Sequence, residues 1–211
     1  MRRLLVYVLL DTSGSMQGEP IEAVNAGMET LVGALRQDPY ALETVHLTVI
    51  TFDADARTVV PLARLEDVVL PRITTPRSGP THLGLALEML GRQATQDIVK
   101  GTDSVKGDWA PFLFVMTDGK PSDIERYNAQ CAEIKKLGFA QIIGCAAGPK
   151  AREEDLRQIC DSVVRLDTMD TAAFGKLFQW VSAVIAHGSK SQGIAGAAEL
   201  PAPPPEINVV F

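Results

Sequence analysis

Asp11 and Asp118 stand in two short polar stretches that contain the side chains best suited to chemistry. The first stretch, DTSGSM, places Ser13 and Ser15 at alternate positions after Asp11, with Gly14 between the two serines. Alternate side chains on a tight loop can turn toward one point, and glycine gives such a loop the backbone freedom that it needs. Carboxylate and hydroxyl oxygens are ligands that Mg²⁺ and Mn²⁺ prefer. The pattern therefore indicates half of a site for a hard divalent cation.

Each aspartate follows a run of apolar residues that predicts a buried strand. Leu4–Leu10 precedes Asp11, and the run PFLFVMT (Pro111–Thr117) precedes Asp118. Both runs are apolar throughout, as in strands that are covered on both faces of a parallel sheet. In such sheets ligands bind beyond the carboxyl ends of the strands, near the point where the strand order reverses. Two carboxylates that meet there repel each other, and one stays protonated unless a cation lies between them.

A third loop, SGPTHL, carries Thr81 and leads into a helix pattern that begins near His82. The threonine hydroxyl adds a further hard oxygen to the ligand set. The expected cofactor is Mg²⁺ or Mn²⁺, and no residue is assigned a catalytic role. Asp11, Ser13, Ser15 and Asp118 are the candidate ligands in the first two loops, and Thr81 stands in a third loop that could meet them.

Strand and helix patterns alternate along the rest of the chain. Further strands are expected over residues 44–52, 57–65, 140–146 and 162–166. Helices are expected from near residue 20, from near residue 82, from the capping box S-x-x-E at Ser122, and over residues 153–160 and 170–186. Pro61 confines its strand to an edge or a bulge, where it pairs back across the turn Asp53–Ala56. This order predicts a doubly wound, mostly parallel α/β sheet with one antiparallel edge strand and helices on both faces.

Residues 1–187 are expected to form one domain, followed by a tail over residues 188–211 that is rich in glycine and proline. The tail is interpreted as a flexible linker or a segment that docks on a partner. Its end, INVVF, is apolar enough to add to a sheet edge or to enter a partner groove.

Charge and composition exclude several classes of protein. The formal net charge is −6 and the pI about 5.1, which argues against a surface built for nucleic acid or anionic lipid. No stretch approaches the roughly 20 apolar residues that a membrane span requires. The two arginines before Leu4–Leu10 imitate a signal peptide, but no small-residue cleavage site follows. Cys131, Cys145 and Cys160 lie far apart, without the spacing of a disulfide framework or a zinc site. A reducing, cytoplasmic location is expected.

The stretch DTSGSM resembles the D-x-S-x-S signature of von Willebrand factor A (VWA) domains. Thr81 and Asp118 match the threonine and aspartate of that family's metal-ion-dependent adhesion site (MIDAS). The order of elements resembles the family from about Leu4 to Ala186. The resemblance implies that the serines and the threonine coordinate the metal, with the aspartates in contact directly or through water. It also implies that a carboxylate of a protein partner fills the open coordination position.

Three further stretches resemble the TerY-type subgroup of this family. They are GDWAPFLFVMTDGKPSD, VITFDADA and LRQDPYALETV. The subgroup is associated with tellurium resistance and with bacterial stress or phage-response gene clusters. The resemblance implies an adaptor that acts beside a kinase-like protein and a PP2C-type phosphatase. TerY-like chains extend into a metal-binding C-terminal module, and this sequence has only the proline-rich tail there.

Two other functions compete with a noncatalytic binding module. One is a magnesium-dependent phosphohydrolase or phosphotransferase with Asp11 as nucleophile. Against it, Ser13 stands where a second aspartate would act as acid and base, and only Lys120 and Arg77 offer positive charge in the loops. The other is a module that binds phosphorylated peptide at the metal, which suits a kinase and phosphatase context.

Other polar residues near these loops favour structural roles. Asp53 and Asp55 are expected to form the hairpin turn, because aspartate is common in turns. Asp123 is expected to interact with the dipole at the start of its helix. His82 is expected to be structural or to lie at the rim of the site, and Trp109 is expected to anchor its own loop.

Overall fold

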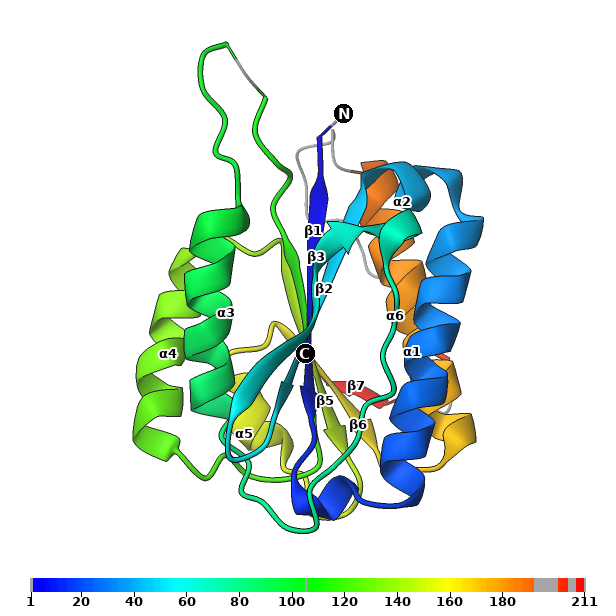
Figure 1. Ribbon diagram of the computed structural model, residues 1–211, viewed down its shortest axis with the longest axis vertical. Helices are drawn as coiled ribbons and strands as arrows, with labels where there is room; N and C mark the ends of the chain where they lie inside the picture. Colours follow the sequence, from blue (N-terminus) through cyan, green and yellow to red (C-terminus); the bar gives the residue numbers. More distant parts are fainter. Residues whose placement is uncertain (1, 105, 192–200, 205–207, 211) are drawn as a thin grey trace.

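The computed structural model describes residues 2–104, 106–191, 201–204 and 208–210, which form one sheet between two layers of helices (Figure 1). The strands are β1 (Leu4–Asp11), β2 (Val45–Phe52), β3 (Ala56–Arg64), β4 (Phe112–Thr117), β5 (Gln141–Ala147), β6 (Ser162–Leu166) and β7 (Asn208–Val210). The helices are α1 (Glu19–Gln37), α2 (Pro39–Thr44), α3 (Leu83–Asp97), α4 (Ile124–Lys136), α5 (Glu153–Arg157) and α6 (Thr171–Ser191). Two single turns of 3₁₀-helix are η1 (Gly14–Met16) and η2 (Leu65–Asp67).

The strand order is β3-β2-β1-β4-β5-β6-β7. The pairs from β2 to β6 are parallel, and β3 pairs with β2 in the antiparallel sense at the edge. The predicted doubly wound, mostly parallel sheet is therefore confirmed. After β1 the chain builds outward through β2 and β3, then returns to place β4 on the other side of β1. The strand order reverses between β1 and β4, so the loops that follow these two strands meet at one end of the sheet.

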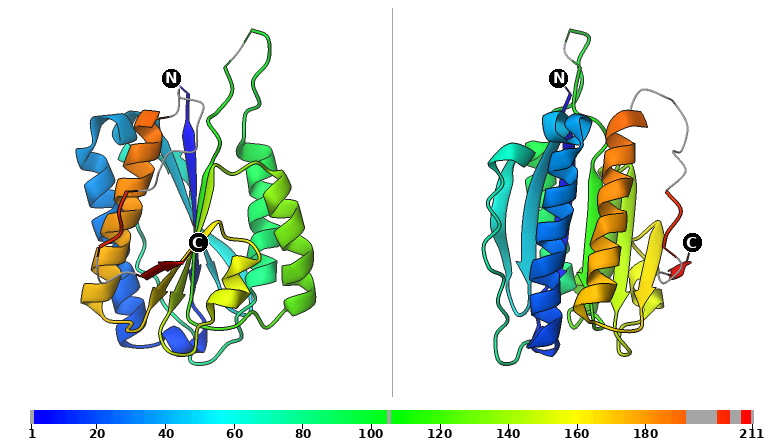
Figure 2. Two further views of the ribbon diagram at one scale, coloured as in Figure 1. Left: turned by 180° about the vertical axis from the view of Figure 1, so that it is seen from behind. Right: turned by 90° about the vertical axis from the view of Figure 1, so that its right-hand side faces the viewer.

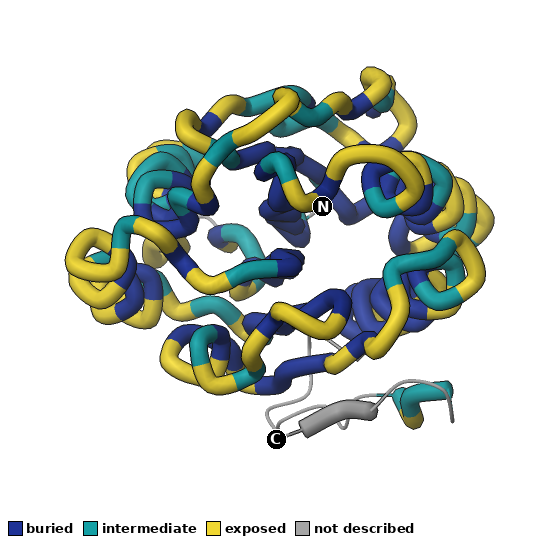
Figure 3. Tube along the Cα trace, turned by 90° about the horizontal axis from the view of Figure 1, so that it is seen from below, coloured by how far each residue is buried: buried dark blue, intermediate teal, exposed yellow. Residues whose placement is uncertain are grey.

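β1 shows why helices cover both faces of the sheet. All eight of its residues are buried. Val6 and Val8 belong to the core cluster that includes residues of α1 and α6, whereas Tyr7 and Leu9 belong to the cluster that includes α3 and α4. Figures 1 and 2 show α1, α2 and α6 on one face and α3, α4 and α5 on the other. Figure 3 shows the buried segments inside these layers and the exposed segments around the outside.

Several element ends differ from the sequence prediction. The predicted capping box at Ser122 is wrong: α4 begins at Ile124, Asp123 stands at the N-cap position, and the helix start receives no side-chain hydrogen bond from it. The Ser122 side chain instead binds the backbone of Thr81, before α3, and the Asp123 side chain binds the first turn of α3. Gly138, shortly after the end of α4, has a φ of +72°, which glycine tolerates best.

Two helices, α5 and α6, have different lengths from those predicted, and a further helix, α2, was not predicted. α5 ends at Arg157, three residues before the predicted end, and α6 continues to Ser191, beyond the predicted end at Ala186. The sequence pattern did not predict α2, which begins at Pro39 and is capped by the Asp38 carboxylate through the N–H groups of Tyr40 and Ala41. α2 has only six residues, too few for an apolar periodicity to show.

The tail adds a second antiparallel edge strand where the sequence predicted only one. β7 pairs antiparallel with β6, with Val210 opposite Val163 and Asn208 opposite Arg165. The tail's predicted flexible or partner-docking character over residues 192–200, 205–207 and 211 falls outside the described residues. In the described part of the chain, no helix is both long and apolar enough to cross a membrane.

Candidate metal centre

Asp11 lies at the end of β1, fully buried, with a hydrogen bond on each carboxylate oxygen. The Ser13 N–H donates to Oδ1 at 2.7 Å, and the Thr117 hydroxyl donates to Oδ2 at 2.6 Å. Thr117 ends β4, so this second bond joins the ends of the two strands between which the strand order reverses. Each carboxylate oxygen keeps a lone pair with which it can bind a metal ion or a metal-bound water.

The hydroxyls of Ser13 and Ser15 extend the oxygen cluster from the end of β1 to Asp118, which follows β4. The hydroxyls of Ser13 and Ser15 lie 3.1 Å apart, and the Ser15 hydroxyl donates to Asp118 Oδ1 at 2.8 Å. Ser13 and Asp118 are buried, whereas Ser15 is exposed. The cluster is therefore accessible from outside on the side of Ser15.

Thr81 completes the cluster from the segment before α3. A Cβ atom built on Gly119 would lie 3.4 Å from the Thr81 hydroxyl oxygen, which places this hydroxyl against the turn that carries Asp118. The backbone of Thr81 is held by Ser122 in two places. The Ser122 N–H donates to the Thr81 carbonyl at 2.8 Å, and the Thr81 N–H donates to the Ser122 hydroxyl at 3.1 Å.

Gly14 allows the first and third loops to touch. A Cβ atom on Gly14 would lie 2.8 Å from the Cα atom of Ser78, which is closer than real Cβ contacts come. Any larger residue at this position would push the DTSGSM loop away from the segment before Thr81. The structure therefore brings all five predicted ligand residues to one end of the sheet.

The cluster places two carboxylates in a poorly solvated position. Burial raises the pKa of Asp11 to about 6, although the hydrogen bonds from Thr117 and Ser13 oppose the rise. Burial also raises the pKa of Asp118, against the hydrogen bond from Ser15. Because a divalent cation would stabilise both charged forms, the electrostatics favour cation binding here.

The chemistry of the donors fits a hard cation. The cluster offers two carboxylates and three hydroxyls, and oxygen donors of this kind suit Mg²⁺ or Mn²⁺. Among the described residues, no group of three or more histidine, cysteine, aspartate or glutamate side chains could hold a metal. The three cysteines are free and buried, so a thiolate zinc site has no basis in the described part of the chain.

Asp53 makes the predicted hairpin turn and also supports the site. Its Oδ1 atom accepts from the Asp55 N–H at 3.1 Å, and its Oδ2 atom accepts from the Thr12 hydroxyl at 3.2 Å. Its carbonyl accepts from the His82 N–H at 2.9 Å. The turn after β2 thus holds residues next to Asp11 on one side and next to Thr81 on the other.

Asp123 stands at the start of α4, where the sequence predicted an interaction with the helix dipole, but its side chain makes no hydrogen bond to that helix. Its two carboxylate oxygens accept from the Gly84 N–H at 3.0 Å and the Leu85 N–H at 2.8 Å. These N–H groups belong to the first turn of α3, which directly follows Thr81 and His82. Sequence reasoning missed Thr117, Ser122 and Asp123 as supports of the site, because their partners lie 38 or more residues away along the chain.

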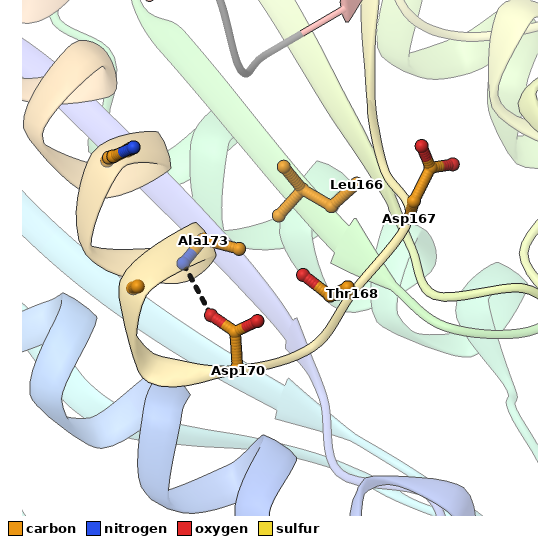
Figure 4. A pocket seen from close by; sticks show the side chains of 7 residues that line it. Leu166, Asp167, Thr168, Asp170 and Ala173 are labelled. Carbon is orange, nitrogen blue, oxygen red and sulfur yellow. Dashed lines mark hydrogen bonds between the residues drawn. The ribbon is translucent and has the colours of Figure 1, made fainter.

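A separate pocket of about 250 Å³ lies between the end of β6 and the start of α6 (Figure 4). The Asp170 carboxylate accepts from the Ala173 N–H there at 2.8 Å, and so caps α6. None of the five predicted ligand residues lines this pocket. The pocket is lined by Leu166, Asp167, Thr168, Asp170, Ala172, Ala173 and Lys176.

Comparison with known proteins gives one family. The family model of the von Willebrand factor type A domain matches residues 6–177. No curated protein matches the sequence.

Several solved structures share the fold. A von Willebrand factor type A protein from Catenulispora acidiphila is 19% identical with a TM-score of 0.68, over 88% of this chain and 43% of that one. Proximal thread matrix protein 1 from the mussel byssus, described with a zinc-occupied MIDAS motif, is 18% identical with a TM-score of 0.64, over 86% of this chain and 48% of that one. BatB from Bacteroides thetaiotaomicron, a conserved hypothetical protein, is 18% identical with a TM-score of 0.52, over 85% of this chain and 97% of that one. The chain thus spans less than half the length of the first two, and likeness at this identity shows the fold alone.

Proposed function

Because this chain belongs to the von Willebrand factor type A domain family, we propose that it is a noncatalytic protein-binding module that depends on a divalent metal. The observation that carries the proposal is the hydrogen bond between the Ser15 hydroxyl and the Asp118 carboxylate, within a cluster of hard oxygens. The proposed ligands are the five residues predicted from the sequence. They are Asp11, Ser13, Ser15, Thr81 and Asp118.

The ligand chemistry supports a carboxylate as the partner group. Three of the five proposed ligands are neutral hydroxyls, so the bound cation keeps part of its positive charge. The exposed side of the cluster, at Ser15, is where an incoming aspartate or glutamate side chain would reach the cation. Mg²⁺ or Mn²⁺ is the proposed ion because the donors are hard oxygens. The zinc in the MIDAS motif of the mussel protein supports a divalent ion in sites of this kind.

The residues give little support for phosphoryl transfer. Ser13 stands where a second carboxylate would act as acid and base, and Lys120 and Arg77 are exposed on their loops. Phosphoryl transfer needs positive charge that is positioned on the transferred group. The module is therefore proposed to bind rather than to catalyse.

The stretches that resemble TerY-type chains support a cellular setting for this module. They favour an adaptor in a bacterial tellurium-resistance, stress or phage-response system, beside a kinase-like protein and a PP2C-type phosphatase. A cytoplasmic location is part of this proposal. The site itself offers no route to tellurium chemistry, because its donors are hard oxygens and the cysteines are buried.

Affinity capture with and without metal tests the proposal. The bait proteins are the wild-type chain, the Asp118→Asn variant and a control, Thr30→Ala, which removes an exposed hydroxyl on α1. We expect wild type and control to retain the same partner in Mg²⁺ and to lose it in EDTA, and Asp118→Asn to retain none. Identical capture in EDTA, or phosphoester hydrolysis by wild type that Asp11→Asn abolishes, would contradict a noncatalytic metal-dependent module.

A further inference from the structure

Two described pieces of the tail contact two different elements of the domain. The indole N–H of Trp180, on α6, donates to the Pro201 carbonyl at 2.9 Å. Further along, β7 pairs with β6 over three residue pairs. Figure 2 shows these C-terminal segments beside α6 and at the outer edge of the sheet, beyond β6. The tail therefore contacts a helix and a strand edge in succession.

The outer edge of β6 is a template for an added strand. An edge strand presents a row of N–H and C=O groups that a further extended segment can pair with. In the described part of the chain only β7 uses this edge, and it supplies three residues. Three residues are at the short end of the range for strands, so this pairing contributes little stability by itself.

Trp180 supplies the second anchor. Trp180 is 4% exposed, and its indole N–H can only donate, so this buried group needs a hydrogen-bond acceptor. Pro201 provides that acceptor at the start of the run PAPPP. Proline-rich segments are extended before they bind, and they commonly dock on aromatic side chains. An aromatic anchor followed by a strand edge matches a segment that is first proline-rich and then β-branched.

We propose that Trp180 and the outer edge of β6 form a docking site for an extended segment of another protein. The segment has the chemistry of residues 201–210, a proline-rich part followed by one glutamate and then by uncharged, mostly β-branched residues. In the isolated chain its own tail fills the site and competes with the partner segment. This site is independent of the metal centre, because β6 is separated from β4 by β5 and none of the five ligand residues contributes to it.

Because the tail is joined to the domain, it competes with a partner segment at a high effective concentration. A segment joined to its site by a short linker acts at an effective concentration in the millimolar range. A free segment with the same contacts must outcompete that concentration. The tail therefore keeps the site closed to weak or dilute partners.

A labelled peptide tests the proposal on the full-length chain. The probe is the peptide PAPPPEINVVF, with a fluorophore at its N-terminus, titrated in EDTA so that the metal centre plays no part. The variant carries Val209→Pro and Val210→Pro together. Alternate N–H groups of a strand face the neighbouring strand, so two adjacent prolines always remove one N–H that faces β6. We expect the peptide to bind this variant about ten-fold or more tightly than it binds wild type. A peptide with the same two prolines is the control and is expected not to bind.

Trp180→Phe in the same variant removes the indole N–H and keeps an aromatic ring. We expect it to weaken peptide binding several-fold. Because Trp180 is buried, the melting temperature falls as well, so binding is measured well below it. Equal affinity for wild type and the double-proline variant, no binding to the variant, or equal binding of the control peptide would overturn the proposal. A wild-type dimer that the two prolines abolish would overturn the proposed occupant, because the site would then hold the tail of a second copy.

Discussion

Gly14 lies where the loop after β1 touches the segment before Thr81, and its lack of a side chain is what allows this contact. A Cβ atom there would meet the Cα atom of Ser78 at 2.8 Å, and a backbone atom cannot rotate away as a flexible side chain can. The two loops would have to separate, carrying the hydroxyls of Ser13 and Ser15 away from Thr81. The alternation of ligands in DTSGSM thus depends on the residue between the serines.

Gly14→Ala is therefore expected to weaken metal binding more than it destabilises the domain. Displaced supports around a metal commonly cost about 10–100-fold in affinity, and calorimetric titration with Mg²⁺ measures this loss. The matched control is Gly33→Ala, on α1, where a Cβ atom meets nothing within 4 Å. The control should raise stability by about 0.5–1 kcal/mol through helix propensity and leave metal affinity unchanged. Equal metal affinity in both variants would show that the two loops need not touch.

At the scale of elements, the starts of α3 and α4 are joined through Ser122 and Asp123. Ser122 holds the backbone of Thr81, and Asp123 caps the first turn of α3. A side chain that caps a helix typically contributes about 1 kcal/mol. Here the capped helix, α3, begins two residues after the proposed ligand Thr81, so the Asp123 cap helps to fix the position of Thr81.

Asp123→Ala is expected to lower stability by about 0.5–2 kcal/mol in urea unfolding. It should also lower Mg²⁺ affinity, because Thr81 is no longer fixed by the helix that follows it. Asp38→Ala is a matched control, since Asp38 caps α2 far from the site through the N–H groups of Tyr40 and Ala41. The control should lose stability while keeping metal affinity. Loss of metal affinity in both variants to the same extent would assign the effect to general destabilisation.

The opposite end of the sheet is held by an ion pair. Arg3, before β1, contacts Asp108 at 2.6 Å, and the Asp108 side chain is 5% exposed. Burial alone would raise the pKa of Asp108, but hydrogen bonds from Arg3 and the Val99 N–H, with the charge of Arg3, hold it below its usual value. Trp109 anchors its loop, as predicted. Its backbone N–H donates to the Arg3 carbonyl, and its ring lies beneath the Arg2 guanidinium.

Because the pKa of Asp108 is lowered in the folded chain, its stabilisation is present above the ordinary aspartate pKa near 4. It disappears as the pH falls through the lower folded value. Asp108→Asn is therefore expected to cost about 1.5–3 kcal/mol at pH 7. The difference from wild type should shrink progressively below about pH 4. Urea unfolding across pH 3–7 measures it, and a difference that stays constant with pH would contradict a charge-based role.

Across the whole molecule, the sheet was predictable because its signals are local. The runs that became β1 and β4 are apolar throughout, and each ends on an aspartate. Spacing indicated Asp11, Ser13 and Ser15, the strand end indicated Asp118, and the resemblance to VWA domains added Thr81. The supports of the site were not predictable, since Thr117, Ser122 and Asp123 act on residues brought near only by the fold. For INVVF the sequence left two alternatives open, a sheet edge or a partner groove, and residues 208–210 pair with the edge of β6. The sequence could not choose the edge, because a short β-branched segment pairs with whichever edge is free.

The packing of the whole molecule also determines the behaviour of its thiols. Cys131, Cys145 and Cys160 are free and buried, and burial raises the pKa of each thiol above its usual value. We expect none of the three to react with a thiol reagent in the folded chain. All three should become reactive over the same guanidinium range in which circular dichroism reports unfolding. Fast reaction of any one of them under native conditions would show that its helix or strand opens locally.

The central claim, a divalent-metal site at the ends of β1 and β4, is tested most directly by thermal melts of chelated protein titrated with Mg²⁺. A ligand at 100 times its Kd stabilises the folded state by about 2.7 kcal/mol. We predict a saturable rise in melting temperature for wild type and for the Thr30→Ala control. The Asp11→Asn, Ser13→Ala and Asp118→Asn variants should show none. A wild type that does not respond at millimolar Mg²⁺ or Mn²⁺, or variants that respond as wild type does, would contradict the claim.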